Sequence, residues 1–254
     1  MQTSAGAGRR PRRDAAANRE SLIRAAALCL AESPDASLEQ IAAAAGLTRR
    51  AVYGHFANRD ELVFALIERG TERLNRAAEP SATEISAPVA IALLGARLWS
   101  VVGHVRLLAS MALTQPYVER VTIALAPVRE HLGAVVALGI ADGTLRGDLR
   151  PELLERLVEG SAIAVLLESA RTGMPDAEGR RVAMLSMLAT AGLSWREAGD
   201  LIDATPALRA RENDPGDPGP YDLPFDAPFS GARTDTDQTD NGAGPESSPI
   251  GVLS

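Results

Sequence analysis

The stretch Leu38–Phe56 reads LEQIAAAAGLTRRAVYGHF and decides the fold. Ser37, directly before it, is a favourable N-cap, and Gln40 three residues later completes a capping box, so a short helix should begin here. Gly46 should end that helix in the left-handed conformation, which glycine adopts without strain. Thr48 can then cap a second helix. The stretch therefore predicts two short helices joined by a glycine turn, the arrangement of a helix-turn-helix.

The second of these helices should present its N-terminal half to solvent. Ala42 and Ala45 are small enough to let the first helix pack closely against it, while Val52 and Phe56 should point inward. The residues expected on the exposed side are Thr48, Arg49, Arg50, Ala51 and Tyr53. Exposed arginines can reach phosphates or guanine edges, and a bidentate contact to guanine discriminates by about 1–3 kcal/mol. We predict a DNA-contacting surface here; the alternative is an ordinary solvated helix face.

Charge is distributed unevenly along a chain whose formal net charge is −7. All 26 basic residues are arginine, which excludes the P-loop, Schiff-base and kinase classes of site that need a lysine. Residues 1–80 hold 12 arginines against 10 acidic residues, whereas residues 205–254 hold 3 against 9. The basic charge is therefore concentrated near the predicted helix-turn-helix, and most of the acidity lies at the C-terminal end.

Several site classes and locations are not expected. The three histidines are far apart in sequence with no cysteine at ligand spacing, and no catalytic constellation is evident, so we predict no metal, no cofactor and no enzymatic activity. The single cysteine cannot form an internal disulfide, and neither a signal peptide nor a membrane-spanning run is apparent. The expected location is the cytoplasm, away from membranes.

The composition predicts an all-α protein in four parts. Apolar residues make up 46% and aromatics only 4%, so the core should be built mainly from Ala, Leu and Val. The predicted parts are a disordered basic arm at 1–13, a helix-turn-helix domain of three helices at 14–60, a helical effector-binding and dimerisation domain at 61–205, and a disordered acidic tail rich in Pro and Gly at 206–254. Helices are predicted from about 14 to 33, from 58 to 78, and at 88–112, 117–141, 152–171, 177–192 and 195–204. The basic arm either enters a DNA minor groove or only aids solubility.

Two segments in the C-terminal half are apolar on every side or nearly so, at 162–167 and 182–191. A helix that is apolar all round is buried on two faces. The simplest reading is a dimer interface of four helices, two from each subunit; the alternative is one large core.

A ligand pocket is predicted between the helices at 88–112, 117–141 and 152–171. Its candidate lining residues are Trp99, His104, Leu108, Met111, Tyr117 and Val121. The same residues at helical spacing could equally be plain core. Charges are scarce in 88–112, which favours a largely apolar ligand.

Three spaced motifs resemble the N-terminal signature of the TetR family of transcriptional regulators. They are the Ile-Ala-x-x-Ala-Gly-type turn at Ile41–Leu47, the Tyr-x-x-Phe element at Tyr53–Phe56, and the Arg-x-x-Leu helix start at Arg59–Leu62. The resemblance covers about residues 18–66. One departure is the segment Ser33–Ala36, where the family often has a glycine after its first helix.

The resemblance implies nine or more helices, a homodimer and a C-terminal ligand pocket. It implies base contacts mainly by Arg49, Arg50 and Ala51, and phosphate contacts by Ser37, Tyr53, His55 and Arg59. We therefore predict a ligand-responsive DNA-binding regulator, a repressor released from a palindromic operator by a small, largely apolar molecule. The alternative is an all-α small-molecule carrier or enzyme with a vestigial helix-turn-helix.

Overall fold

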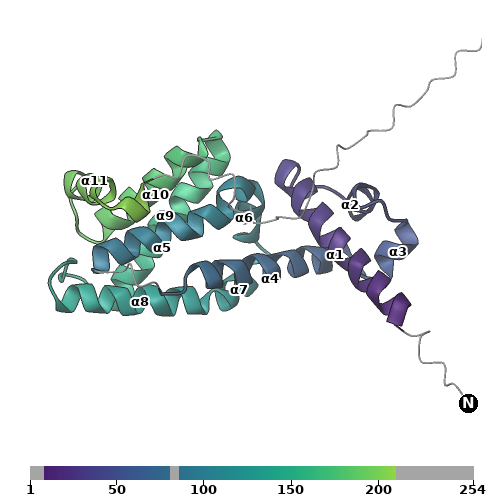
Figure 1. The fold of residues 1–254 in the computed structure, drawn as a ribbon, viewed down its shortest axis with the longest axis horizontal. Coiled ribbons are helices and arrows are strands. Elements are labelled where there is room, and N and C mark those ends of the chain that lie inside the picture. The colour runs from purple at the N-terminus through teal and green to yellow at the C-terminus, as the bar shows by residue number, and fades with distance from the viewer. Residues whose placement is uncertain (1–8, 81–85, 210–254) are drawn as a thin grey trace, which may run out of the picture. The chain divides into compact units, whose positions relative to one another are not determined.

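The computed structural model describes residues 9–80 and 86–209 (Figure 1). Within these ranges the chain forms eleven α-helices and two short 3-10 segments, and no strand. One compact unit takes in every described residue. The all-α prediction is confirmed.

Four helices form the N-terminal part: α1 (Arg9–Glu32), α2 (Leu38–Ala44), α3 (Arg49–Tyr53) and α4 (Arg59–Ala77). The cap of α2 is the predicted capping box, because the Ser37 hydroxyl accepts from the Gln40 amide at 3.2 Å and the Gln40 side chain accepts from the Ser37 amide at 2.7 Å. Gly46 has φ of +67°, the left-handed conformation predicted for it. The Thr48 hydroxyl accepts from the Ala51 amide at 3.3 Å and caps α3. Interactions between residues close in sequence thus form the turn.

Helix α1 begins earlier than predicted. It starts at Arg9, so residues 9–13 of the predicted disordered arm are helical. The side chains of these residues, and residues 1–8 entirely, lie outside the described part. The proposed contact of the arm with a minor groove stays a prediction.

The core of the N-terminal part is shared with helices that follow much later. Leu22 and Leu30 of α1, Ile41 of α2 and Leu66 of α4 are buried together. Leu108, Tyr117 and Val121 belong to the same cluster, and they come from the segment around α6 (Arg106–Ala112) and α7 (Val118–Ala124). The predicted domain boundary at 60/61 falls in the first turn of α4 and does not coincide with a division between cores.

The remaining helices are α5 (Ala87–Val102), α8 (Ala126–Ala141), α9 (Pro151–Thr172), α10 (Asp176–Thr190) and α11 (Trp195–Ala204), with 3-10 segments η1 (Gly103–Val105) and η2 (Pro206–Leu208). In Figure 1, α10 lies beside both α5 and α9, and all three contribute to one buried cluster with α8. Residues 87–96 of α5 are buried throughout, because helices cover it on several sides.

Two predicted helices are each broken in two. The predicted helix at 88–112 is interrupted by η1, where a Cβ added to Gly103 would lie only 2.1 Å from a carboxylate oxygen of Asp176. The break therefore lies against the first residue of α10. The predicted helix at 117–141 is interrupted at Leu125, because Pro127 at the start of α8 has no N–H to continue the helical ladder.

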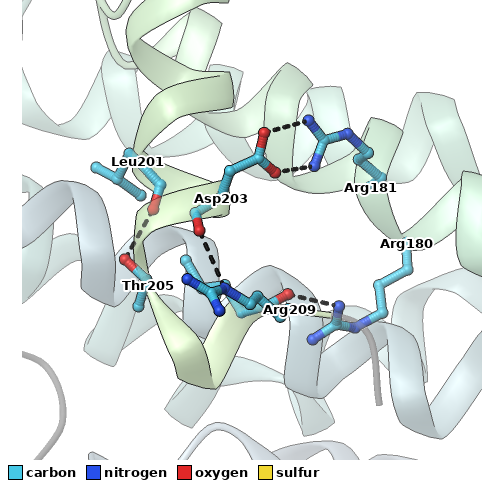
Figure 2. Close-up of polar contacts among 7 residues, drawn as sticks. Arg180, Arg181, Leu201, Asp203, Thr205 and Arg209 are labelled. Carbon is cyan, nitrogen blue, oxygen red and sulfur yellow. Dashed lines mark hydrogen bonds and ion pairs between the residues drawn. The ribbon is translucent and has the colours of Figure 1, made fainter. Parts of the chain in front are cut away.

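A small polar network attaches the C-terminal end to α10 (Figure 2). Arg181 donates to both carboxylate oxygens of Asp203 at 2.8 and 3.3 Å, and this bond lowers the pKa of Asp203. Arg180 donates to the Leu208 carbonyl at 2.9 Å, and Leu208 is buried. Ordered structure therefore continues past residue 206, where the tail was predicted to begin. Residues 210–254 lie outside the described part.

In residues 9–80 and 86–209, no single helix is long and apolar enough to cross a bilayer. Two bent pairs, α5 with α6 and α7 with α8, reach the required length and apolarity only jointly.

Candidate functional site

The recognition surface consists of Ser37, Glu39, Thr48, Arg49, Arg50, Ala51 and Tyr53, contributed by the start of α2 and by α3. Arg49 and Arg50 are exposed at the N-terminus of α3, while Val52 of the same helix is buried. Helix N-termini carry unpaired backbone N–H groups that favour phosphate. Side chains and backbone donors on this surface can therefore approach the same nucleic acid strand.

An acidic residue that sequence reasoning overlooked lies in the middle of this surface. The Glu39 carboxylate accepts from the Tyr53 hydroxyl at 3.1 Å and lies 3.4 Å from the Arg49 guanidinium. Arg49 also stacks over the Tyr53 ring, 5.5 Å from its centroid. The backbone amide of Glu39, the Tyr53 hydroxyl and the nearby Arg49 lower the pKa of the carboxyl. Glu39 thus stays ionised and holds two predicted DNA-contacting side chains together.

The other predicted DNA-contacting residues are placed as follows. The Ser37 and Thr48 hydroxyls accept the capping bonds described above, and each keeps an O–H donor. Ala51 and His55 are half-buried. Contacts of all these residues with bases or phosphates stay predictions.

The Arg59 guanidinium is hydrogen-bonded to other residues of the protein. Its Nε donates to the Ala36 carbonyl at 2.9 Å, and Nη2 donates to the Pro34 carbonyl. Nη1 donates to the Tyr117 hydroxyl at 3.3 Å. These bonds brace the Ser33–Ala36 segment, the place where the chain departs from the expected family pattern. The structure therefore gives Arg59 a role in positioning α2, and its phosphate contact stays a prediction.

Tyr117, directly before α7, connects the Arg59 hydrogen bonds to the later helices. Its hydroxyl donates to Asp60 at 2.7 Å, and its ring meets Phe64 edge-on with centroids 5.2 Å apart. Burial, and then the bond to Asp60, raise the pKa of Tyr117. The start of α7 is thereby hydrogen-bonded to the start of α4, next to the loop that carries α2.

A cavity of about 670 Å³ lies among the helices from α4 onward. Its walls come from α4 through α10, so α4 and α10 join the helices predicted to surround it. Of the six predicted lining residues, Trp99, Leu108 and Val121 face it, whereas Met111 and Tyr117 are not among its walls. The side chain of His104 lies outside the described part. The volume is within the range of about 300–1,000 Å³ that small-molecule sites occupy.

Most of the cavity wall is apolar, and the exceptions are mainly arginines that sequence reasoning missed. The charged lining residues are Arg73, Arg129, Arg156 and Glu159. Arg129 donates through Nε to both carboxylate oxygens of Glu159 at 2.9 and 3.1 Å, and through Nη1 to the Thr122 carbonyl at 2.5 Å. On α4 and α9 these residues are among several charged residues, and nothing in the sequence distinguishes those that face the cavity.

No group of three or more His, Cys, Asp or Glu side chains in residues 9–80 and 86–209 could hold a metal ion.

Comparison with known proteins identifies the N-terminal part. Residues 22–66 match the family model of bacterial regulatory proteins of the tetR family. No curated protein sequence matches the chain.

Several solved structures share the fold. The regulator FadR from Bacillus subtilis, in complex with stearoyl-CoA, is 17% identical with a TM-score of 0.56, covering 68% of this chain and 97% of FadR. The TetR-like regulator LfrR from Mycobacterium smegmatis, in complex with proflavine, is 25% identical with a TM-score of 0.51, covering 70% of this chain and 96% of LfrR. Residues 22–66 therefore match the tetR family of bacterial regulatory proteins, and the chain shares its fold with TetR-like regulators.

Proposed function

We propose that this chain is a ligand-responsive DNA-binding regulator that represses transcription as a homodimer on a palindromic operator in the cytoplasm. A small, largely apolar molecule in the cavity releases it. The observation that carries this proposal is the pairing of a family-matched helix-turn-helix, with Arg49 and Arg50 exposed, and an apolar cavity in the same compact unit. The family-matched helix-turn-helix favours the regulator over the enzyme or carrier.

The proposed release works by population shift. A ligand that fits one conformation of the cavity better than another increases the share of that conformation. Leu108 and Val121, which line the cavity, belong to the N-terminal core, and Tyr117 beside them is bonded to Arg59 and Asp60. Movement of α6 and α7 around a ligand would therefore shift the brace on the segment before α2, and with it the recognition surface.

Dimerisation is proposed through α9 and α10. Leu157, Ala164 and Leu167 are exposed on α9 at helical spacing, and Val182 and Leu185 on α10 are only partly buried. Two recognition surfaces about 34 Å apart would address successive major grooves on one side of the duplex. Light scattering on the native chain and on Leu167→Glu tests this: a dimer that becomes a monomer is expected, and an unchanged mass contradicts this interface.

The DNA-binding part of the proposal is tested by selection from a pool of random duplexes, followed by gel shifts of the recovered sequence across salt concentrations. A two-fold symmetric motif with half-sites one helical turn apart is expected. Affinity should fall steeply with salt because phosphate contacts release counterions. The double variant Arg49→Ala and Arg50→Ala should lose the specific complex.

The matched control is Arg150→Ala with Arg196→Ala, which removes two exposed arginines remote in sequence from α3. It keeps the same change in net charge and should bind the selected duplex as the native chain does. Equal loss in both double variants would mean that overall charge, rather than the recognition surface, drives binding. Failure to recover any preferred duplex would contradict the proposal.

A further inference from the structure

More of the charged side chains that line the cavity are positive than negative. Arg73 lines it from α4, Arg129 from α8, and Arg156 and Glu159 from α9. The lining therefore carries three cations and one anion. The two similar ligand-bound structures hold molecules of different chemistry, stearoyl-CoA and proflavine, so neither indicates which ligand this cavity takes.

The one acidic lining residue is already paired with Arg129. Both Glu159 oxygens receive a hydrogen bond from Arg129, and the two side chains are each only 26% exposed. A cationic ligand would have to compete with Arg129 for Glu159. An acceptor on a ligand meets no such competition, because a guanidinium carries five N–H donors and the bonds to Glu159 and Thr122 use two of its nitrogens.

Arg156 adds a second donor one turn before Glu159 on the same helix. It is exposed where it lines the cavity, next to Gly160, which is also exposed. Glu155 is the other acidic group close by; it does not line the cavity, and burial followed by the charge of Glu159 raises its pKa. Positive charge thus predominates on the wall itself, at the α8–α9 side.

We infer that the cavity takes an elongated apolar molecule with one negatively charged end, of the chemical class of a fatty carboxylate. The carboxylate lies against Arg129 and Arg156, and the hydrocarbon lies among Leu94, Leu98, Trp99 and Leu166. This inference rests on the proposed function, in which the same cavity holds the effector. Charge-assisted hydrogen bonds to a guanidinium, partly shielded from water, favour the anion over a neutral molecule of equal length.

The chain provides its own optical probe of the cavity. Its two tryptophans differ sharply, because Trp99 lines the cavity and is 3% exposed, whereas Trp195 is 71% exposed. The variant Trp195→Phe leaves Trp99 as the only tryptophan, so its fluorescence reports on the cavity. Trp195 belongs to neither the recognition surface nor the cavity wall.

The experiment titrates full-length Trp195→Phe with dodecanoate, dodecan-1-ol and dodecylamine, each below its micelle concentration. Dodecanoate is expected to bind at least about tenfold more tightly than dodecan-1-ol, and dodecylamine more weakly than both. Adding Arg156→Gln, or the pair Arg129→Gln with Glu159→Gln, should reduce the preference for dodecanoate to about threefold or less. The pair avoids leaving the partly buried Glu159 carboxylate without its partner. Arg150→Gln, an exposed arginine at the start of α9 outside the cavity, should keep the full preference.

Equal binding of dodecanoate and dodecan-1-ol, tighter binding of dodecylamine, or no response from Trp99 to any of the three would each overturn the inference. DNA binding is measured separately on the same protein without added amphiphile. Intact DNA binding without a dodecanoate preference contradicts the ligand class alone, whereas loss of DNA binding with intact dodecanoate binding contradicts the proposed function alone.

Discussion

The recognition surface and the cavity are built in opposite ways. The recognition surface comes from fewer than twenty consecutive residues, Ser37–Tyr53, and its shape depends on two caps and one glycine. The cavity is assembled from residues of α4 to α10, and no single short stretch of the chain forms it. A surface made by short-range contacts keeps its internal shape even when it moves as a unit, whereas a cavity made by long-range packing can change shape with what fills it. The first arrangement suits a fixed contact with DNA, and the second suits a variable response to a ligand.

The largest effect is expected where the core that supports the recognition surface and the cavity wall share a residue. Leu66 is 1% exposed, belongs to the N-terminal core and also lines the cavity. Leu66→Ala should lower the free energy of unfolding by about 2–5 kcal/mol, the usual cost of truncating a buried leucine. Denaturant unfolding measures this, and both DNA binding and ligand binding should weaken together.

Leu138→Ala provides the control, because Leu138 is 67% exposed and such substitutions usually stay within about 0.5 kcal/mol. If Leu66→Ala weakened DNA binding and left ligand binding unchanged, the two regions would be energetically separate.

Arg59 comes next, as the residue that links the regions without belonging to either. Arg59→Met removes the bonds to the Pro34 and Ala36 carbonyls and to the Tyr117 hydroxyl. The unfolding free energy should fall by about 1.5–3 kcal/mol, because hydrogen bonds from a charged donor to partly buried acceptors are lost. Thermal unfolding in the absence of DNA measures the loss.

The competing role for Arg59 is phosphate contact. In that case Arg59→Met would leave the melting temperature unchanged and would only weaken DNA binding and its salt dependence. Arg76→Met, an exposed arginine late in α4, is the matched substitution for comparison.

A smaller effect is expected when only the recognition surface is changed. Thr48→Ala removes the cap of α3, which costs about 0.5–2 kcal/mol of local helix stability. DNA affinity should fall several-fold, while the dodecanoate affinity measured with Trp99 fluorescence stays the same. Thr48→Ser keeps the hydroxyl and should restore DNA binding; a loss in Thr48→Ser equal to that in Thr48→Ala would rule out the cap as the cause.

The smallest effect is expected at Glu39, and it should have the opposite sign. Glu39→Gln removes a negative charge from the recognition surface and keeps an acceptor for the Tyr53 hydroxyl. DNA affinity should rise a few-fold, because Arg49 is freed from its ion pair and no carboxylate repels the phosphates. Gel shifts of both proteins on selected and unrelated duplexes measure the change.

The direction of the Glu39 pKa makes this prediction sharper. Since the folded pKa lies below the usual value of 4.5, the carboxylate and its contacts are fully present above that value and are lost only as pH falls below it. The gain in Glu39→Gln should therefore be the same at pH 6 and pH 8. A gain that disappears at pH 6 would mean that the Glu39 carboxyl is already neutral there, which contradicts the lowered pKa.

Features that depend on neighbours in sequence were predictable. The Ser37–Gln40 capping box, the left-handed Gly46 and the Thr48 cap could all be inferred, because the partners lie within four residues of each other. The break at Pro127 carried a sequence signal that the prediction did not use, since a proline inside a predicted helix marks an end or a kink.

Features that depend on partners far away in sequence were not predictable. Gly103, in the interruption, lies against Asp176, more than seventy residues later in the sequence. Tyr117 was expected in the cavity on the basis of its aromatic character, but its hydroxyl is bonded to Asp60. Arg129 and Glu159 meet across two helices, and nothing near either residue indicates the other. Periodicity identifies which side of a helix is apolar, and it does not identify what that side contacts.

The shared core has a practical consequence for protein engineering. Because Leu108, Tyr117 and Val121 complete the core beneath α1, α2 and α4, a fragment ending after α4 would expose the apolar side of that core to water. A chimaera that joins this helix-turn-helix to a different sensor would have to carry the α6–α7 segment along with it. The helix-turn-helix is therefore not a domain that one cut in the chain can separate. The smallest unit with a complete core comprises two segments, 9–80 and 105–125.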